Sequence, residues 1–179
     1  MTSNEYHILK KNAYLLDGPI LEVGGRRVSK FPTNKSLFPD KEYLSLDLEM
    51  GDEVDIIHDM EKPLDRKFNS VICCSVLEHV QRPWLVARNI ERCLNPGGHL
   101  YVAAPFVWRY HNYPGDYWRY TDSTFKVIFP RIEWDFIYYA TRKRGEIAGT
   151  YHELSSIYKE TLSTMSATVC VVIGLGVRK

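Results

Sequence analysis

Val71-Ile72-Cys73-Cys74 leads into Ser75-Val76-Leu77-Glu78-His79-Val80, and this stretch decides the fold of the chain. A helix is expected to begin at Pro83, and the turn signal Asn95-Pro96-Gly97-Gly98 precedes a second apolar run from Leu100 to Pro105. A short apolar run bounded by turn signals is typical of a strand buried on both faces, and two such strands around one helix form a parallel crossover. Such units carry ligand-binding loops at the carboxyl ends of their strands, so function is expected there.

Three more strands upstream end in a glycine pair or an acid. They are Pro19-Ile20-Leu21-Glu22-Val23-Gly24-Gly25, Tyr43-Leu44-Ser45-Leu46-Asp47 and Val54-Asp55-Ile56-Ile57-His58-Asp59-Met60. The order of these signals, followed by Leu77-Glu78-His79-Val80 and Asn95-Pro96-Gly97-Gly98, resembles the class I S-adenosylmethionine-dependent methyltransferases. The resemblance covers residues 20–105 well and the remainder loosely.

The resemblance implies an α/β fold with a doubly wound, mostly parallel seven-stranded sheet and an antiparallel last strand, the Rossmann-like methyltransferase fold. Apolar runs at 134–140 and 168–177 read as its two closing strands. Helices are expected over residues 5–16, from Pro83 to Leu94, and from a cap at Thr121-Asp122 to about residue 129. The second helix places four side chains on the face that should lie on the sheet: Trp84, Ala87, Ile90 and Leu94.

Length and composition favour a single small domain. The 179 residues are expected to form one S-adenosylmethionine-dependent methyltransferase domain over residues 1–179. A net charge of +1 gives no reason to expect nucleic acid or an anionic membrane as a partner. Nucleic-acid methylation is also disfavoured because no Asn/Asp-Pro-Pro-Tyr/Phe motif follows the fourth strand. No apolar run reaches the ~20 residues that span a bilayer, and no signal peptide is evident, so a cytoplasmic location is the default expectation.

The four cysteines and six histidines show no spacing typical of metal ligands. The cysteines are interpreted as small buried apolar residues in a reducing compartment. No metal is expected.

S-adenosylmethionine is the cofactor that the resemblance implies, bound at the carboxyl ends of the first four strands. The implied cofactor-binding residues are Glu22, Gly24, Gly25, Asp47, Leu48, Asp59, Met60 and Ser75. In Gly24-Gly25-Arg26-Arg27-Val28, an arginine and a valine stand where the family pattern usually has its second and third glycines. Because a dinucleotide fold uses three glycines to approach a pyrophosphate, this departure argues more against a nicotinamide cofactor than against a methyltransferase.

Several of these residues suit a particular part of S-adenosylmethionine. Asp47 can accept hydrogen bonds from both ribose hydroxyls, since a carboxylate offers several acceptor sites; alternatively it caps a turn. By resemblance, Asp59 accepts from the adenine amine and the Met60 backbone N–H donates to a ring nitrogen; alternatively Asp59 is a solvated loop acid. Glu22 and Gly24 are expected under the methionine tail, the glycine because a Cβ would block close approach of the backbone.

The aromatic-rich segment 106–121 follows Pro105 and is expected to hang over the site. Within it, His111 and Asp116 are the candidate catalytic residues, because a hydroxyl acceptor must lose its proton. The alternative is a self-packed aromatic lid in which Asp116 pairs with Arg119. His79 is a further candidate base, or a structural residue bonded to the backbone.

The expected function is methyl transfer from S-adenosylmethionine to an oxygen or nitrogen of a small molecule or sugar, since aromatic faces suit a sugar or a planar substrate. The alternative is a catalytically inert S-adenosylmethionine-binding module with a protein-interaction role, in which the atypical glycine loop marks lost chemistry. A small-molecule or saccharide acceptor is the expected partner, with no nucleic acid and no membrane. The sequence leaves the acceptor, the methylated atom and the oligomeric state open.

Overall fold

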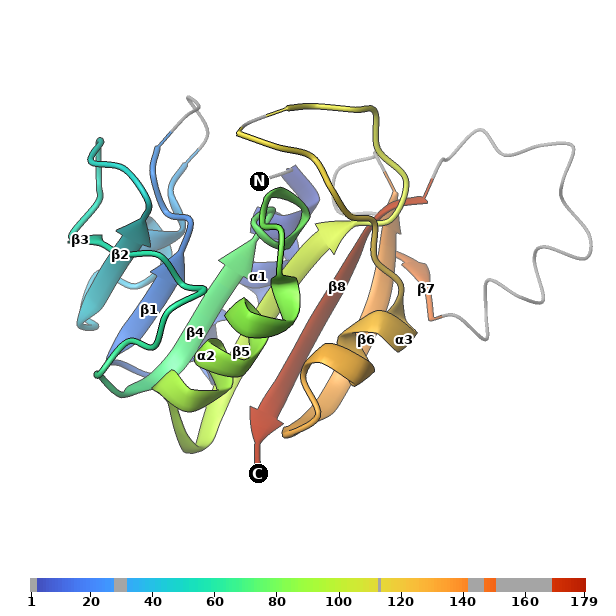
Figure 1. The fold of residues 1–179 in the computed structure, drawn as a ribbon. Helices are drawn as coiled ribbons and strands as arrows, with labels where there is room; N and C mark the ends of the chain where they lie inside the picture. The colour runs from blue at the N-terminus through green and yellow to red at the C-terminus, as the bar shows by residue number, and fades with distance from the viewer. Residues whose placement is uncertain (1–2, 28–31, 113, 142–146, 151–168) are drawn as a thin grey trace, which may run out of the picture.

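A computed structural model describes residues 3–27, 32–112, 114–141, 147–150 and 169–179. Its core is an eight-stranded sheet in the order β3-β2-β1-β4-β5-β8-β6-β7 (Figure 1). The strands are β1 (Ile20–Val23), β2 (Tyr43–Asp47), β3 (Ile56–Ile57), β4 (Phe68–Cys74), β5 (Leu94–Pro105), β6 (Ile132–Thr141), β7 (Ile147–Gly149) and β8 (Val169–Arg178). The helices are α1 (Ser3–Asn12), α2 (Pro83–Cys93) and α3 (Asp122–Ile128), with 3₁₀ turns η1 (Ala13–Leu15), η2 (Asn34–Leu37) and η3 (Leu77–His79).

The strand directions confirm the predicted fold class. Strands β1 to β5 pair in parallel, whereas β8 is antiparallel to both β5 and β6. The last strand in the sequence therefore inserts antiparallel to its neighbours, as expected. Two details differ from the prediction: the strand expected over residues 54–60 shortens to the two residues of β3, and β7 adds a short edge strand beside β6.

Helices cover both faces of the sheet, as Figure 1 shows with α2 and α3 on one face and α1 on the other. The apolar residues of β4 alternate between these faces, since successive strand residues point in opposite directions. Val71 packs in the cluster that contains Ile90 of α2. Ile72 packs in the second cluster, with Leu9 of α1. The four cysteines are buried and free, as their interpretation as apolar core residues predicts.

Helix α2 begins at Pro83 as predicted, but its buried face is rotated from the predicted one. Val86 is buried together with Ala87 and Ile90, whereas Trp84 is 49% exposed. The prediction was wrong at Trp84 because this residue lies at the border of the apolar stripe, where its ring makes an edge contact with Trp118 at 6.1 Å between centroids.

The segment between β5 and α3 crosses above the carboxyl ends of the parallel strands, where Figure 1 shows it in yellow. The two ends of this segment lie next to each other, because the Tyr120 N–H donates to the Pro105 carbonyl at 2.9 Å. Thr121 then caps α3 by accepting from the Thr124 N–H at 3.2 Å, which confirms the predicted cap. Across the described part of the chain, no helix has the length and apolar character needed to cross a membrane.

We expect Ile90→Ala to lower the free energy of unfolding by about 2–5 kcal/mol, because it leaves a cavity between α2 and the sheet. Val127→Ala is the control: this α3 residue is 76% exposed, so its truncation should change stability by no more than about 0.5 kcal/mol. Urea unfolding followed by circular dichroism measures both. Equal effects of the two substitutions would contradict the described packing of α2.

Candidate functional site

A cleft of about 910 Å³ opens at the carboxyl ends of β1, β2 and β4. All eight residues predicted to bind a cofactor line it, and so does His111. The volume lies within the range of roughly 300–1,000 Å³ that is common for small-molecule sites. The tertiary structure thus brings the predicted strand-end residues together around one cavity.

Gly24 forms the floor of the cleft in a conformation that other residues rarely adopt. Its φ is +73°, and its N–H donates to the Leu46 carbonyl of β2 at 2.8 Å. A Cβ at this position would lie 2.3 Å from Cγ2 of Val76. Both the left-handed backbone and the close packing therefore require glycine here.

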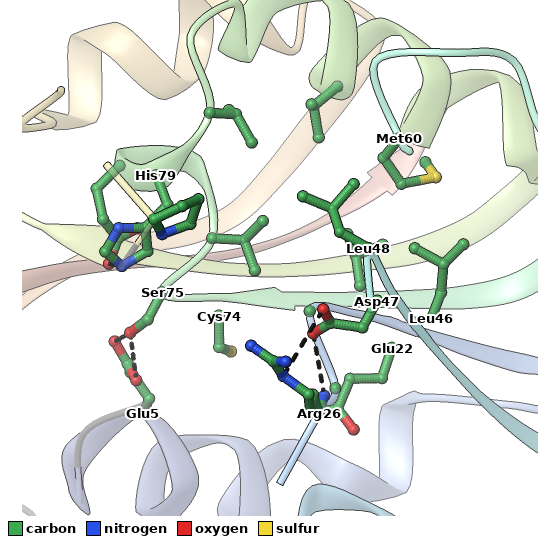
Figure 2. Close-up of a pocket in the computed structure, with 18 of the residues that line it drawn as sticks. Glu5, Glu22, Arg26, Leu46, Asp47, Leu48, Met60, Cys74, Ser75 and His79 are labelled. Atoms are coloured by element: carbon green, nitrogen blue, oxygen red, sulfur yellow. Dashed lines mark hydrogen bonds and ion pairs between the residues drawn. The ribbon is translucent and has the colours of Figure 1, made fainter. Parts of the chain in front are cut away.

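Glu22 lines the cleft close to Arg26 (Figure 2). Its carboxylate accepts hydrogen bonds from the Tyr43 hydroxyl at 2.7 Å and from Asn34 Nδ2 at 2.6 Å. Burial raises the pKa of Glu22, and these two hydrogen bonds oppose that rise. A Cβ on Gly25 would lie 2.0 Å from Ser45 Oγ and 3.1 Å from Glu22 Oε2, so the second glycine lets the loop pass close to both side chains.

Asp47 ends β2 with its carboxylate at the cleft, where Figure 2 shows it facing Arg26. It accepts from the backbone N–H groups of Arg26 and Glu49, both at 3.3 Å, and the Arg26 guanidinium approaches to 4.0 Å. These contacts are longer than ordinary hydrogen bonds, so the carboxylate keeps acceptor capacity for a ligand. Leu48 follows it and is 54% exposed along the cleft wall.

Asp59 and Met60, which follow β3, line another part of the cleft. Asp59 Oδ1 accepts from the Glu61 N–H at 2.9 Å, and its Oδ2 lies 3.8 Å from Lys62 Nζ. The Met60 carbonyl accepts from Asn89 Nδ2 of α2 at 2.9 Å, and the Met60 side chain is buried in the core. Helix α2 therefore fixes the backbone of this part of the cleft, while the Asp59 side chain also makes the local contacts expected of a loop acid.

Ser75 follows β4 and contacts an acid that the sequence analysis missed. Its hydroxyl is within hydrogen-bond distance of both carboxylate oxygens of Glu5, at 2.9 and 3.1 Å (Figure 2). Glu5 belongs to α1 and is only 1% exposed. Seventy positions separate the two residues, so only the packing of α1 behind the sheet brings this carboxylate to the cleft.

Glu78 is the second residue that sequence reasoning left without a role. Its side chain is 2% exposed, and Oε1 lies 3.7 Å from His79 Nε2 and 4.0 Å from His111 Nε2. Burial raises the pKa of Glu78 to about 8. His79 donates from Nδ1 to the Gly115 carbonyl at 2.5 Å, the kind of backbone bond expected of a structural histidine, and burial lowers its pKa.

The two candidate catalytic residues lie side by side but differ in exposure. The Asp116 side chain is 1% exposed and pairs with the Arg119 guanidinium, with Nη2 at 2.8 Å from Oδ2. This pair holds the pKa of Asp116 well below its usual range. His111 lines the cleft, and its Nδ1 lies 3.2 Å from Asp116 Oδ2. His111 thus faces the cleft while Asp116, in the predicted pair with Arg119, supports it from behind.

Hydrogen bonds tie the aromatic segment to the turn after β4. The Tyr117 N–H donates to the Glu78 carbonyl at 2.8 Å, Trp118 Nε1 donates to the Val80 carbonyl at 3.0 Å, and the Tyr120 hydroxyl donates to the Leu77 carbonyl at 2.7 Å. Tyr117 and Trp108 also line the cleft. Tyr113, expected in the same cover, lies outside the described residues.

The sheet order and the strand-end cleft together define a Rossmann-like protein of the methyltransferase type. The family described as "Methyltransferase domain" matches residues 17–134. The chain belongs to this family. No match was found among the curated proteins compared with it.

Several solved structures have the same fold at low sequence identity. The 1,6-didemethyltoxoflavin-N1-methyltransferase of Burkholderia thailandensis, with bound 1,6-didemethyltoxoflavin and S-adenosylhomocysteine, has a TM-score of 0.65 at 10% identity, covering 98% of this chain and 78% of that one. N-methyltransferase NodS from Bradyrhizobium japonicum WM9, in complex with S-adenosylhomocysteine, has a TM-score of 0.60 at 10% identity, covering 96% and 83%. The YcgJ protein of Bacillus subtilis has a TM-score of 0.63 at 11% identity, covering 98% of each chain. At these identities the likeness establishes the fold alone.

We expect Gly24→Ala to destabilise the protein more than Gly97→Ala does. Both glycines have positive φ, at +73° and +78°, so each substitution should cost about 1–2 kcal/mol of backbone strain. Only Gly24 has a neighbour in the path of the new Cβ, because nothing lies within 4 Å of a Cβ at Gly97. Urea unfolding measures the difference.

The double substitution Gly24→Ala with Val76→Ala tests the origin of that difference. Removing the Val76 methyl groups takes away the atom that a Cβ at Gly24 would meet. Measured against Val76→Ala alone, the alanine at Gly24 should then cost no more than it does at Gly97. A cost that stays as large as before would show that the clash with Val76 is not the cause.

Proposed function

We propose that this protein transfers the methyl group of S-adenosylmethionine to an oxygen or nitrogen atom of a small molecule or sugar. The observation that carries the proposal is the convergence of the strand-end residues, among them Gly24, Asp47 and Ser75, on one cleft that also contains the His111 imidazole. Membership of the methyltransferase domain family supports the same reaction class. In this proposal residues 1–179 act as a single domain.

S-adenosylmethionine is the cofactor that the family implies, and the residues of the cleft fit it. The Asp47 carboxylate suits the ribose hydroxyls, and Asp59 with the Met60 backbone suits adenine. Glu22 and the glycine pair suit the methionine tail, together with Ser75. When bound, the cofactor supplies an electrophilic methyl group on a positively charged sulfur.

The acidic lining of the cleft supports this choice of cofactor. Glu22 and Glu78 both line the cavity, and the side-chain contacts described above for their carboxyl groups come from Tyr43, Asn34 and two imidazoles, not from a lysine or arginine. Burial disfavours the charged form of these carboxyl groups, so a positively charged ligand that stabilises their ionised form is favoured beside them. The sulfonium and the amino group of S-adenosylmethionine are both positive, whereas a pyrophosphate would be repelled.

Arg26 has a structural role in the atypical glycine loop. Its guanidinium forms an ion pair with Glu49 and approaches Asp47, which ties the loop to the end of β2. A Cβ on Gly51 would lie 2.6 Å from Arg26 Cδ, so the neighbouring turn is shaped around this arginine. The loop is thus built around an arginine in place of a glycine, which favours an active enzyme over an inert module.

His111 is the residue we assign to activation of the acceptor. Its Nδ1 lies 3.2 Å from two acceptors, the Arg109 carbonyl and Asp116 Oδ2, so in the neutral ring Nδ1 carries the proton. The lone pair of Nε2 then faces the cleft, where it can take a proton or bind a cation. Asp116 is a positioning residue that fixes this tautomer.

The proposed function predicts which residue should affect cofactor affinity. Asp47→Ala should weaken binding of S-adenosylhomocysteine by about 1.5–3 kcal/mol, because a charge-assisted hydrogen bond to the ribose is lost. Asp65→Ala, at an exposed acid that does not line the cleft, is the matched control and should bind as the wild type does. Calorimetry measures both. A wild type that binds NAD but neither S-adenosylmethionine nor its product would refute the proposed cofactor.

The second prediction concerns the chemical step. His111→Asn should lower turnover by about 10²- to 10⁴-fold, the usual contribution of an acid–base group, while the affinity for S-adenosylhomocysteine stays nearly unchanged. Turnover is measured as S-adenosylhomocysteine formation over a panel of sugars, phenols and amines. Two of the structures with this fold are N-methyltransferases, so amines belong in the panel. If the wild type binds the cofactor but methylates no acceptor, the inert binding module becomes the better hypothesis.

A further inference from the structure

Three potential metal ligands meet at the end of the cleft below the aromatic segment. They are Glu78, His79 and His111, and one donor atom from each lies within 4.8 Å of the other two. Glu78 Oε1 is 3.7 Å from Nε2 of one histidine and 4.0 Å from Nε2 of the other. An ion with bonds of about 2.1 Å would draw such donors to roughly 3–3.5 Å from one another, so a small closure of side chains suffices.

The hydrogen bonds behind the two imidazoles orient them as metal ligands are usually oriented. His79 Nδ1 donates to the Gly115 carbonyl, and His111 Nδ1 contacts the Arg109 carbonyl and the Asp116 carboxylate. Carbonyl and carboxylate oxygens only accept, so both protons lie on Nδ1. The unprotonated Nε2 atoms are the ones that lie 3.7 and 4.0 Å from Glu78 Oε1. Metal-binding histidines typically donate their second N–H to such a carbonyl or carboxylate.

The burial of the Glu78 carboxyl group is a third observation, independent of the first two. Its side chain is 2% exposed, and among the described residues Oε2 has no hydrogen-bond partner. A buried carboxyl oxygen without a partner is costly, and such groups are usually paired or bound to a metal. The two imidazole nitrogens that lie nearest to this carboxyl group carry lone pairs, so they provide hydrogen-bond acceptors and no donor. A cation between the three side chains would satisfy all of them.

We propose that Glu78, His79 and His111 bind one divalent transition-metal ion at the acceptor end of the cleft. Two imidazole nitrogens and one carboxylate suit Zn²⁺, Mn²⁺ or Co²⁺ better than Mg²⁺ or Ca²⁺, which prefer oxygen ligands. Three protein ligands leave coordination positions open, as in catalytic sites. All three residues line the cleft, and Glu78 is the most deeply buried of them.

The role of the ion, unlike its binding, rests on the proposed function. Open coordination positions next to the cofactor would select an acceptor with a hydroxyl group and a second oxygen on the adjacent atom, such as a vicinal diol of a sugar or a catechol. The ion would hold the hydroxyl oxygen and lower its pKa. That oxygen forms a bond to the methyl carbon while the sulfur–methyl bond breaks, its electron pair stays on sulfur, and the hydroxyl proton passes to solvent.

Metal binding by the purified 179-residue chain tests the site directly. After dialysis against a chelator and then buffer, the wild type should bind one Co²⁺ per chain, seen in its visible absorption spectrum, and one Zn²⁺ by equilibrium dialysis. Glu78→Gln and His111→Asn should each weaken binding at least about 100-fold. Asp116→Asn removes no ligand but takes away the carboxylate charge behind His111 and its ion pair with Arg119, and should weaken binding by about 10- to 100-fold. His99→Asn is the control and should bind as the wild type does, because His99 lies within β5, six residues before Pro105, and does not line the cleft.

Binding of S-adenosylhomocysteine by each variant shows whether it is folded and separates the two proposals. If Glu78→Gln no longer binds this ligand, the comparison rests on His111→Asn and Asp116→Asn. A wild type that takes up no ion, or folded Glu78→Gln and His111→Asn variants that bind it as tightly as the wild type, would overturn the metal site. One bound ion that depends on these residues upholds the site even if no acceptor is methylated, in which case only the proposed function fails.

Discussion

The parallel pairing of β1 with both β2 and β4 is the constraint on which the rest of the structure depends. Each pair aligns the carboxyl ends of its strands, with Val23 opposite Leu46 on one side and Cys73 on the other. Gly24 and Ser75 follow directly, and Asp47 ends β2 beside them. The backbone of Gly24 hydrogen-bonds to Leu46 and its α-carbon packs against Val76, so the cleft floor belongs to the sheet itself.

Burial of acidic groups around this floor gives the cleft its chemical character. Glu22 is held by a tyrosine and an amide, Glu5 by a serine, and Glu78 faces two histidines. Burial raises the pKa of both Glu22 and Glu78, so a positively charged ligand that stabilises their ionised form gains from their presence. The two ends of the cleft differ: glycines and acids surround the proposed cofactor region, whereas imidazoles and aromatic rings surround the proposed acceptor region.

Elements with a strong local signal were predicted well, and those that depend on distant packing were not. Pro83 begins α2 and Thr121 caps α3 because both effects involve only neighbouring backbone groups. The exposure of Trp84 and the short strand β7 depend instead on partners from other elements. Trp84 meets the aromatic segment, and β7 exists only through its pairing with β6.

The fold class and the residues that line the proposed cofactor region of the cleft could be predicted from the sequence alone, since glycines and acids at strand ends are visible as local patterns. The sequence also singled out His111 and Asp116 as candidates in the aromatic segment. Only the tertiary structure decided that His111 faces the cleft and that Asp116 is buried behind it. The same holds for Glu5, brought from α1 to Ser75, and for Glu78, brought to His111 across 33 positions. Periodicity records neighbours along one element, whereas these contacts join elements that meet only when the chain has folded.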